Sequence, residues 1–278
     1  MFYLKKIERI LLGVGIITLF YGCGQSSREK AIEFYDKAEK DDSINDYEMA
    51  IVHFTEAIEL DTSFAGAYSG RGFEEFKAGD FYRAVKDLNK AIRLKPNNTD
   101  YYYYRGMVRI RQGKYGGAIN DFDIEIAKGD LTRRPLKWRG NVKLLSKNYK
   151  GAVDDLTKAL ALDSSDYEEY NSRAVAKSKL LDYEGALIDV KRAIKLDSNQ
   201  ASHYNTLAWI EYLMEDYENS QINYEKAIKK DSTDGVYYAN RGFLKIKLHN
   251  EESACRDFYH ALQLGDSSAV DTIKKYCH

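Results

Sequence analysis

The sequence has almost no surplus of charge of either sign. Its 42 Lys and Arg residues nearly balance 43 Asp and Glu residues, which leaves a formal net charge of −1 at pH 7. Proteins that bind nucleic acid through its phosphates usually carry a strongly basic field. The charge balance therefore argues against a nucleic-acid partner, while 44% hydrophobic and 31% charged residues are typical of a folded globular protein.

The apolar run near the N-terminus is short. It extends from Ile10 to Tyr21 and follows Lys5, Lys6 and Arg9. A membrane-spanning helix needs about 20 apolar residues, whereas a basic segment followed by a shorter apolar core is typical of a secretory signal peptide. We therefore expect residues 1–22 to be a signal peptide that is removed on export.

A cysteine stands directly after this run. The segment Leu19-Phe20-Tyr21-Gly22-Cys23 resembles the lipobox of bacterial lipoproteins, although Phe20 and Tyr21 replace the usual leucine and small residue. The resemblance implies that Cys23 is lipidated, that residues 23–30 form a linker, and that the protein is anchored to a bacterial envelope membrane, periplasm-facing or outer. The alternative is an ordinary membrane-anchoring segment with an incidental Cys, which would tether the protein on the same side.

Residues suited to catalysis are scarce and scattered. None of the five histidines forms an HExxH motif or a pair at metal-ligand spacing. The glycines of residues 113–117 lack the GxxxxGK[ST] order of a phosphate-binding loop. We therefore expect no catalytic, metal or cofactor site, and no enzyme.

The sequence is rich instead in a regular spacing of small residues. Seven of them stand 34 residues apart: Ala50, Ala84, Ala118, Ala152, Ala186, Ser220 and Ala254. A constant period of this length indicates a stack of similar helical repeats rather than one globular core.

Other positions follow the same period when the residues above are taken as position 20, so that repeats begin near residues 31, 65, 99, 133, 167, 201 and 235. Position 8 is always Ala or Gly, position 17 is aromatic in six repeats, position 24 is large and apolar, and position 27 is Ala in six repeats. Residues at these spacings share one face of a helix. Each repeat therefore predicts two helices separated by a turn, with small residues where the helices approach closely.

This pattern resembles the tetratricopeptide repeat over residues 31–264. The resemblance implies an all-α, right-handed superhelical solenoid of antiparallel helix pairs, with seven repeats over residues 31–266. It also implies that the first helices line a concave groove that binds other proteins. We expect residues 267–278 to form a helix that caps the C-terminal end.

A charge pair recurs within the repeats. Repeats 2, 3, 4, 5 and 7 carry Arg at position 7 and Asp at position 23, and repeats 1 and 6 lack both. The pairs are Arg71 with Asp87, Arg105 with Asp121, Arg139 with Asp155, Arg173 with Asp189, and Arg241 with Asp257. Joint presence and absence predict structural ion pairs between helices, either within one repeat or between neighbours.

Two cysteines lie near the C-terminus. Cys255 belongs to the last repeat and Cys277 to the expected capping helix. They form a disulfide in an oxidising compartment, or else Cys255 is a buried free thiol and Cys277 a small packing residue.

By the resemblance, positions 2, 5, 9, 12 and 13 of each repeat face the groove. The candidate partner-binding residues are Phe73, Phe76, Tyr103, Met107, Ile110, Arg111, Lys137, Asn141, Trp209, Tyr212 and Phe243. Lys137 and Asn141 also match the first pair of the carboxylate clamp in chaperone-binding members, but Ser172, Ser202 and Thr206 do not continue it.

Aromatic, Met and cationic side chains are enriched at protein interfaces. The sequence thus predicts a non-catalytic scaffold that binds a protein or peptide. The alternative is a glycan-associated accessory subunit of an outer-membrane uptake system, because aromatic rings also stack on sugars. The oligomeric state stays open.

Overall fold

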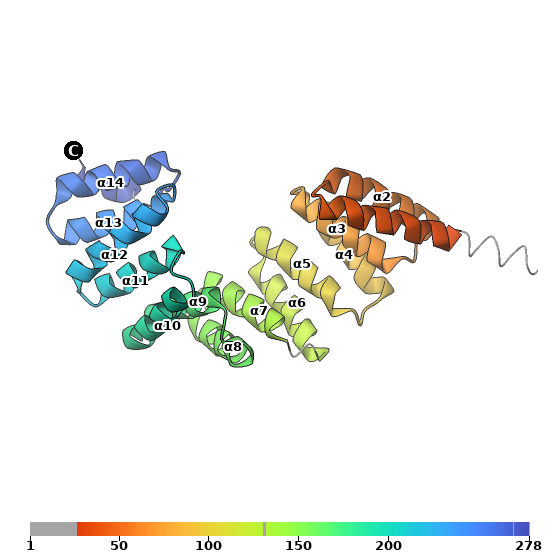
Figure 1. Ribbon diagram of the computed structural model, residues 1–278, viewed down its shortest axis with the longest axis horizontal. Coiled ribbons are helices and arrows are strands. Elements are labelled where there is room, and N and C mark those ends of the chain that lie inside the picture. Colours follow the sequence, from red (N-terminus) through yellow and green to blue (C-terminus); the bar gives the residue numbers. More distant parts are fainter. Residues whose placement is uncertain (1–26, 130–131, 269, 278) are drawn as a thin grey trace, which may run out of the picture. The chain divides into compact units, whose positions relative to one another are not determined.

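The computed structural model describes residues 27–129, 132–268 and 270–277, and all its regular structure within these ranges is helical. The signal peptide, Cys23 and residues 24–26 lie outside the described residues. Residues 27–43 form the first described helix. The others are α2 (Tyr47–Leu60), α3 (Ala65–Lys77), α4 (Phe81–Leu94), α5 (Thr99–Arg111), α6 (Tyr115–Ala127), α7 (Arg133–Leu145), α8 (Tyr149–Leu162), α9 (Tyr167–Lys179), α10 (Tyr183–Leu196), α11 (Ala201–Leu213), α12 (Tyr217–Lys230), α13 (Gly235–Lys247), α14 (Glu251–Gln263) and α15 (Val270–Tyr276) (Figure 1).

The chain divides into two compact units, Met1–Asp130 and Leu131–His278, called here the first and second unit. Within the first unit α3 packs on α4 and α5 on α6. Within the second unit the pairs are α7 with α8, α9 with α10, α11 with α12 and α13 with α14, followed by α15 on α14. Consecutive helices pair in each unit, so each is a stack of helical repeats, as the spacing predicted.

The first described helix begins earlier than expected. Residues 27–30, which we assigned to the linker, are helical. Arg28, Glu29 and Lys30 all have high helix propensity, and none of them interrupts the backbone hydrogen bonding. The helix of repeat 1 therefore extends one turn before Ala31.

The second helix of each repeat begins at position 17, directly after a turn. In six repeats an Asp or Asn before this position accepts a hydrogen bond from a backbone N–H of the first helical turn: Asp46, Asp80, Asn148, Asp182, Asp216 and Asn250. Lys114 occupies this place before α6 and makes no such bond. Capping of the otherwise unpaired N–H groups fixes where each second helix starts.

The core repeats with the sequence period. The seven residues at position 20 are fully buried, and those at position 24 are buried beside them. Glycine at position 8 allows this packing, because a Cβ at Gly106 would lie 2.8 Å from Phe122 and one at Gly242 would lie 2.4 Å from Phe258. Small residues on one helix thus accommodate large rings on the next.

Candidate functional site

The five arginines at position 7 contact the aspartates of their own repeats. Each guanidinium donates from Nε and Nη2 to the two carboxylate oxygens, so every pair is bidentate. The shortest contacts are 2.6 Å for Arg71 with Asp87, Arg105 with Asp121, Arg139 with Asp155 and Arg173 with Asp189, and 2.7 Å for Arg241 with Asp257. The pairs therefore lie within a repeat and join its two helices.

A second cation at position 11 completes four of these pairs. Arg109 contacts Asp121 at 2.6 Å, and the lysines at this position reach Asp155, Asp189 and Asp257 at 2.7–2.8 Å. Burial alone would raise the pKa of Asp155, but hydrogen bonds from Arg139 and Lys143 outweigh burial and lower it. The recurrence of Arg or Lys at position 11 beside Asp at position 23 was visible in the sequence, and we missed it.

Repeats 1, 2 and 6 carry an acid at position 11 instead. In repeat 1, Asp41 at position 11 contacts Nδ1 of His53 at position 23, at 2.5 Å. In repeat 6, Asn223 donates a hydrogen bond to Glu211. In repeat 2, burial and the neighbouring Asp87 raise the pKa of Glu75 to about 7. In these repeats the residue at position 11 thus interacts with the residue at position 23 of the same repeat. This favours a structural role for both over a ligand site.

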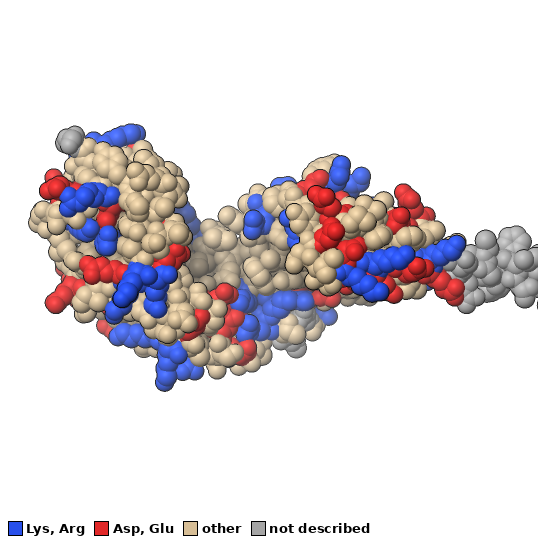
Figure 2. Space-filling model, turned by 45° about the horizontal axis from the view of Figure 1, so that its top comes forward, with Lys and Arg blue, Asp and Glu red and all other residues tan. Residues whose placement is uncertain are grey.

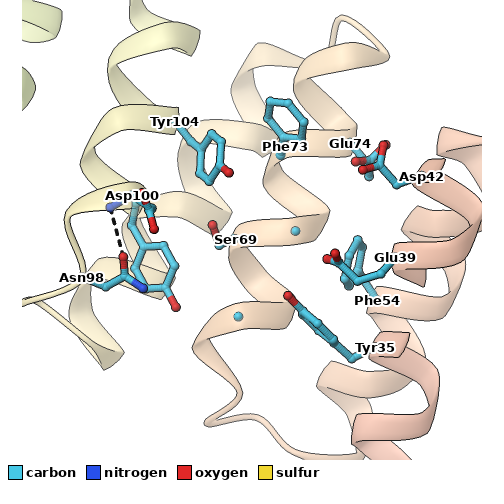
Figure 3. A pocket seen from close by; sticks show the side chains of 13 residues that line it. Tyr35, Glu39, Asp42, Phe54, Ser69, Phe73, Glu74, Asn98, Asp100 and Tyr104 are labelled. Carbon is cyan, nitrogen blue, oxygen red and sulfur yellow. Dashed lines mark hydrogen bonds between the residues drawn. The ribbon is translucent and has the colours of Figure 1, made fainter. Parts of the chain in front are cut away.

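The first unit contains a cavity of about 290 Å³ on the side of its first helices (Figure 3). It is lined by Tyr35, Glu39, Asp42, Phe54, Gly66, Ser69, Gly70, Phe73, Glu74, Asn98, Asp100, Tyr101 and Tyr104. Four of these residues are acidic, and none is Lys or Arg. Lys77, just outside the lining, contacts Glu74 at 2.6 Å and also pairs with Asp42.

The second unit contains a cavity of about 310 Å³ with different chemistry. It is lined by Val175, Lys179, Asn205, Thr206, Trp209 and Asn240. The Lys179 ammonium lies 5.2 Å from the centroid of the Trp209 ring, and Asn240 donates a hydrogen bond to Asn205 at 3.0 Å. The lining has no carboxylate among its described residues.

The predicted groove residues fall into three groups. Phe73 lines the first cavity and Trp209 the second. Phe76, Tyr212 and Phe243 pack on buried core clusters as well, since their rings lie 5.1–6.0 Å from Phe81, Tyr217 and Phe258 respectively. Tyr103, Met107 and Ile110 are half-buried on α5, and Arg111 is exposed. Phe73 and Trp209 are thus the predicted residues that line these two cavities.

Lys137 and Asn141 do not form an open clamp. Lys137 is held by Asp166 at 2.7 Å and Glu168 at 3.2 Å. Burial alone would raise the pKa of Asp166, yet the hydrogen bond from Lys137 holds it below its usual value. The side-chain oxygen of Asn141 is buried. Lys137 is therefore engaged within the second unit and does not present a free charge to a carboxylate.

Most of the first cavity was not predicted. Tyr35 and Ser69 occupy position 5 and Glu39 position 9 of their repeats, which the resemblance places on the groove, but their residue types share no pattern. Glu74, Tyr101 and Tyr104 stand at other positions. The available signal was the group of acids and tyrosines in the first helices of repeats 1 to 3.

The last helix is attached covalently. Cys255 of α14 and Cys277, which follows α15, form a disulfide with Cα atoms 5.6 Å apart. Ile273 and Cys277 pack against the cluster of Ala254 and Phe258. The structure thus selects the disulfide over the free thiols that the sequence also allowed.

Two further properties bear on function. Across the part of the chain that the structure describes, no helix has the length and apolar character needed to cross a membrane, and His, Cys, Asp and Glu form no group of three or more suited to a metal. Basic and acidic side chains are interspersed over the face seen in Figure 2.

Fold and cavities together define a helical-repeat scaffold: stacked helix pairs held by internal ion pairs, with recesses along the first helices. Residues 74–113 match a family model described as TPR repeat, and residues 201–234 match one described as tetratricopeptide repeat. The chain therefore contains tetratricopeptide repeats, as its 34-residue period indicated.

Solved structures agree on the fold. A tetratricopeptide repeat protein from Parabacteroides merdae ATCC 43184 is 18% identical, with 89% of this chain and 97% of that chain covered and a TM-score of 0.74. YrrB, described as a TPR protein with an unusual peptide-binding site, is 21% identical over 64% of this chain and 92% of its own, with a TM-score of 0.55. PilF of Pseudomonas aeruginosa is 16% identical over 77% and 97%, with a TM-score of 0.62. No curated protein matches the sequence.

Proposed function

We propose that this protein is a non-catalytic scaffold that binds a protein segment along the first helices of its repeats. Tetratricopeptide repeats generally bind protein or peptide partners, and YrrB is a structural neighbour described by its peptide-binding site. The observation that carries the proposal is the pair of cavities, one in each unit, lined by aromatic rings beside polar groups. Aromatic anchors in a recess are the residues that dominate interface energetics.

The interior charges support the same conclusion. Each Arg of the recurrent pairs is committed to an Asp of its own repeat. Apart from Phe54 at position 24, the residues that line the cavities stand at positions that vary between repeats, whereas those that recur hold the helices together. A surface that varies over a constant framework is suited to recognising one particular partner.

Binding to a peptide array tests the proposal. The full chain should retain peptides that contain apolar and polar residues in alternation or at helical spacing, and Phe73→Ala or Trp209→Ala should weaken the retained peptides at least tenfold. Tyr82→Ala is the matched control, because Tyr82 is 79% exposed on the second helix α4, away from both cavities. Equal losses in the control, or no peptide retained by the wild-type chain, would refute the proposal.

We also propose that the scaffold is anchored through lipid on Cys23 at a bacterial envelope membrane. The support is the sequence alone: a short basic segment, an apolar run and a Cys in a lipobox-like setting. Two or more acyl chains give stable attachment, since each buried CH₂ contributes about 0.8 kcal/mol. Metabolic labelling with a fatty acid should be lost in Cys23→Ala, and undiminished labelling would contradict the anchor.

A further inference from the structure

The cavity of the first unit has a one-sided charge. Glu39, Asp42, Glu74 and Asp100 contribute four carboxylates to its lining, and the described lining residues include no Lys or Arg. Lys77 compensates one of these charges from outside by pairing with Asp42 and Glu74. Glu39, Asp42 and Glu74 still outnumber this one cation, and in a recess the field of several like charges is focused on whatever enters.

The walls of the same cavity are aromatic. Tyr35, Phe73 and Tyr104 face the recess together with the acids, as Figure 3 shows. The negative face of such rings attracts cations within about 6 Å of the centroid. The chain already uses this interaction there, because the Lys77 ammonium lies 5.1 Å from the centroid of Phe73.

A serine hydroxyl on the cavity wall is open to the recess. Ser69 is 5% exposed, lines the cavity, and makes no hydrogen bond with any residue that the structure describes. In Figure 3 its side chain lies between Tyr104 and Tyr35. The hydroxyl therefore offers its lone pairs to a donor that enters the recess.

Burial near the acids disfavours further negative charge. Glu74 is 1% exposed, and burial raises its pKa. Lys77 offsets this penalty only in part, because the pKa of Glu74 stays raised beside it, and a further positive group near Glu74 and Asp42, whose carboxylates lie next to each other in Figure 3, would relieve the penalty further. An anionic or purely apolar group would not.

We propose that this cavity binds a basic side chain, lysine or arginine, of the partner segment. The inference rests on the scaffold function proposed above and names the chemistry of the partner at this point. A volume of about 290 Å³ lies just below the range for small-molecule sites, about 300–1,000 Å³, and suits one long side chain. The ammonium or guanidinium lies between the carboxylates and over the rings, and donates to Ser69.

Titration of the full chain with defined peptides tests the site. The probes are three fluorescent nine-residue Gly/Ser peptides with blocked ends, in which the central residue is Lys, norleucine or Glu. We expect the Lys peptide to bind at least tenfold more tightly than the other two. Its affinity should fall with added salt, because a recess open to solvent is partly screened.

Three variants assign the effect to the cavity. The double variant Glu39→Gln with Asp42→Asn should weaken the Lys peptide at least fivefold, and Ser69→Ala should weaken it two- to threefold. Glu59→Gln is the matched control, since Glu59 is an exposed acid of α2 that does not line the cavity. Unchanged helical circular dichroism shows that each variant is folded.

The outcomes separate this inference from the scaffold proposal. Equal binding of the Lys and norleucine peptides, or an equal loss in Glu59→Gln, overturns the basic-residue site. If array peptides bind and are lost in Trp209→Ala while the cavity variants have no effect, the scaffold proposal stands and this inference fails. If no array peptide binds the chain, the scaffold proposal fails first.

Discussion

The two units are built from the same repeat and present opposite chemistry in their cavities. The first unit lines its cavity with four acids, three tyrosines and two phenylalanines, whereas the second uses Lys179, Trp209 and two asparagines. Positions 8, 20, 24 and 27 are nearly constant across both units. The period therefore determines the framework, while the residues outside it can vary at little structural cost.

The repeats also differ in how they balance buried charge. In repeat 3 of the first unit and repeats 4, 5 and 7 of the second, Asp at position 23 contacts two cations. In repeat 2 of the first unit, Asp87 shares a single Arg with Glu75. The buried Asp therefore has two cationic partners in some repeats, whereas repeat 2 has two acids beside one Arg.

The largest expected effect comes from removing the aspartate in a compensated repeat. Asp155→Ala leaves Arg139 and Lys143 buried without that carboxylate and should cost about 3–5 kcal/mol. Asp87→Ala should cost only about 1–2 kcal/mol, because Glu75 remains beside Arg71 and loses its repulsion from Asp87. Hydrogen exchange resolved by unit measures both costs.

The exposed neighbour Asp154 provides the control, since Asp154→Ala should change stability by less than about 0.5 kcal/mol. Equal costs for the Asp155 and Asp87 variants would show that repeats 2 and 4 balance charge alike and would remove the contrast.

A smaller effect depends on pH and belongs to repeat 2. The folded-state pKa of Glu75, about 7, lies above its ordinary value of 4.5. Its contribution to stability is therefore fully present below about pH 4.5 and is lost as the pH rises through about 7. Glu75→Gln should be about 1–2 kcal/mol more stable than the wild-type chain at pH 8 and equal to it at pH 4.

Urea unfolding at the two pH values measures this difference. A variant that gains the same stability at pH 4 as at pH 8 would show that the effect comes from packing and not from ionisation of Glu75.

The smallest effect concerns the turns between paired helices. The left-handed turn residue is glycine in repeats 2 and 3, at Gly79 and Gly113, but every described repeat of the second unit uses another residue there, among them Leu181 with φ 66°. In this conformation a non-glycine residue destabilises the folded state by about 1–2 kcal/mol. The lower conformational entropy of its unfolded chain partly offsets this cost. Leu181→Gly should thus stabilise by about 0.5–1 kcal/mol, and Gly79→Ala should destabilise by about 1 kcal/mol.

Thermal unfolding of both variants checks the sign. Leu181 is exposed, and a Cβ at Gly79 would meet no atom within 4 Å. Melting temperatures that shift in opposite directions in the two variants would therefore report backbone conformation alone. Shifts of the same sign would contradict this explanation.

The framework was predictable because each of its residues repeats. Ala or Ser at position 20 and the aromatic at position 17 located the second helices, and their starts at Tyr115, Tyr149 and Tyr183 follow that position. The Arg–Asp pairing was predictable for the same reason. Seven examples of one repeat show which residues vary together.

The cavities were less predictable because they depend on residues that do not repeat. Phe73 and Trp209 were identified from their position in the repeat, but Glu74 and Tyr104 line the first cavity from positions not assigned to the groove. Phe243 was expected in the groove and packs against Phe258 as well. How far a side chain reaches into a recess depends on how neighbouring helices curve around it, which the spacing of one repeat does not specify.

The disulfide at the end of the second unit gives the last helix a dependence on redox conditions. The seven described residues of α15 include none that is buried, and so short a helix is unstable by itself in water. Its attachment therefore depends largely on the bond between Cys255 and Cys277. In a reducing solution α15 would be held only by weak contacts such as that of Ile273, and the apolar surface around Ala254 and Phe258 would be intermittently open to water. The oxidised and reduced proteins would therefore offer different surfaces to other molecules at this end of the second unit.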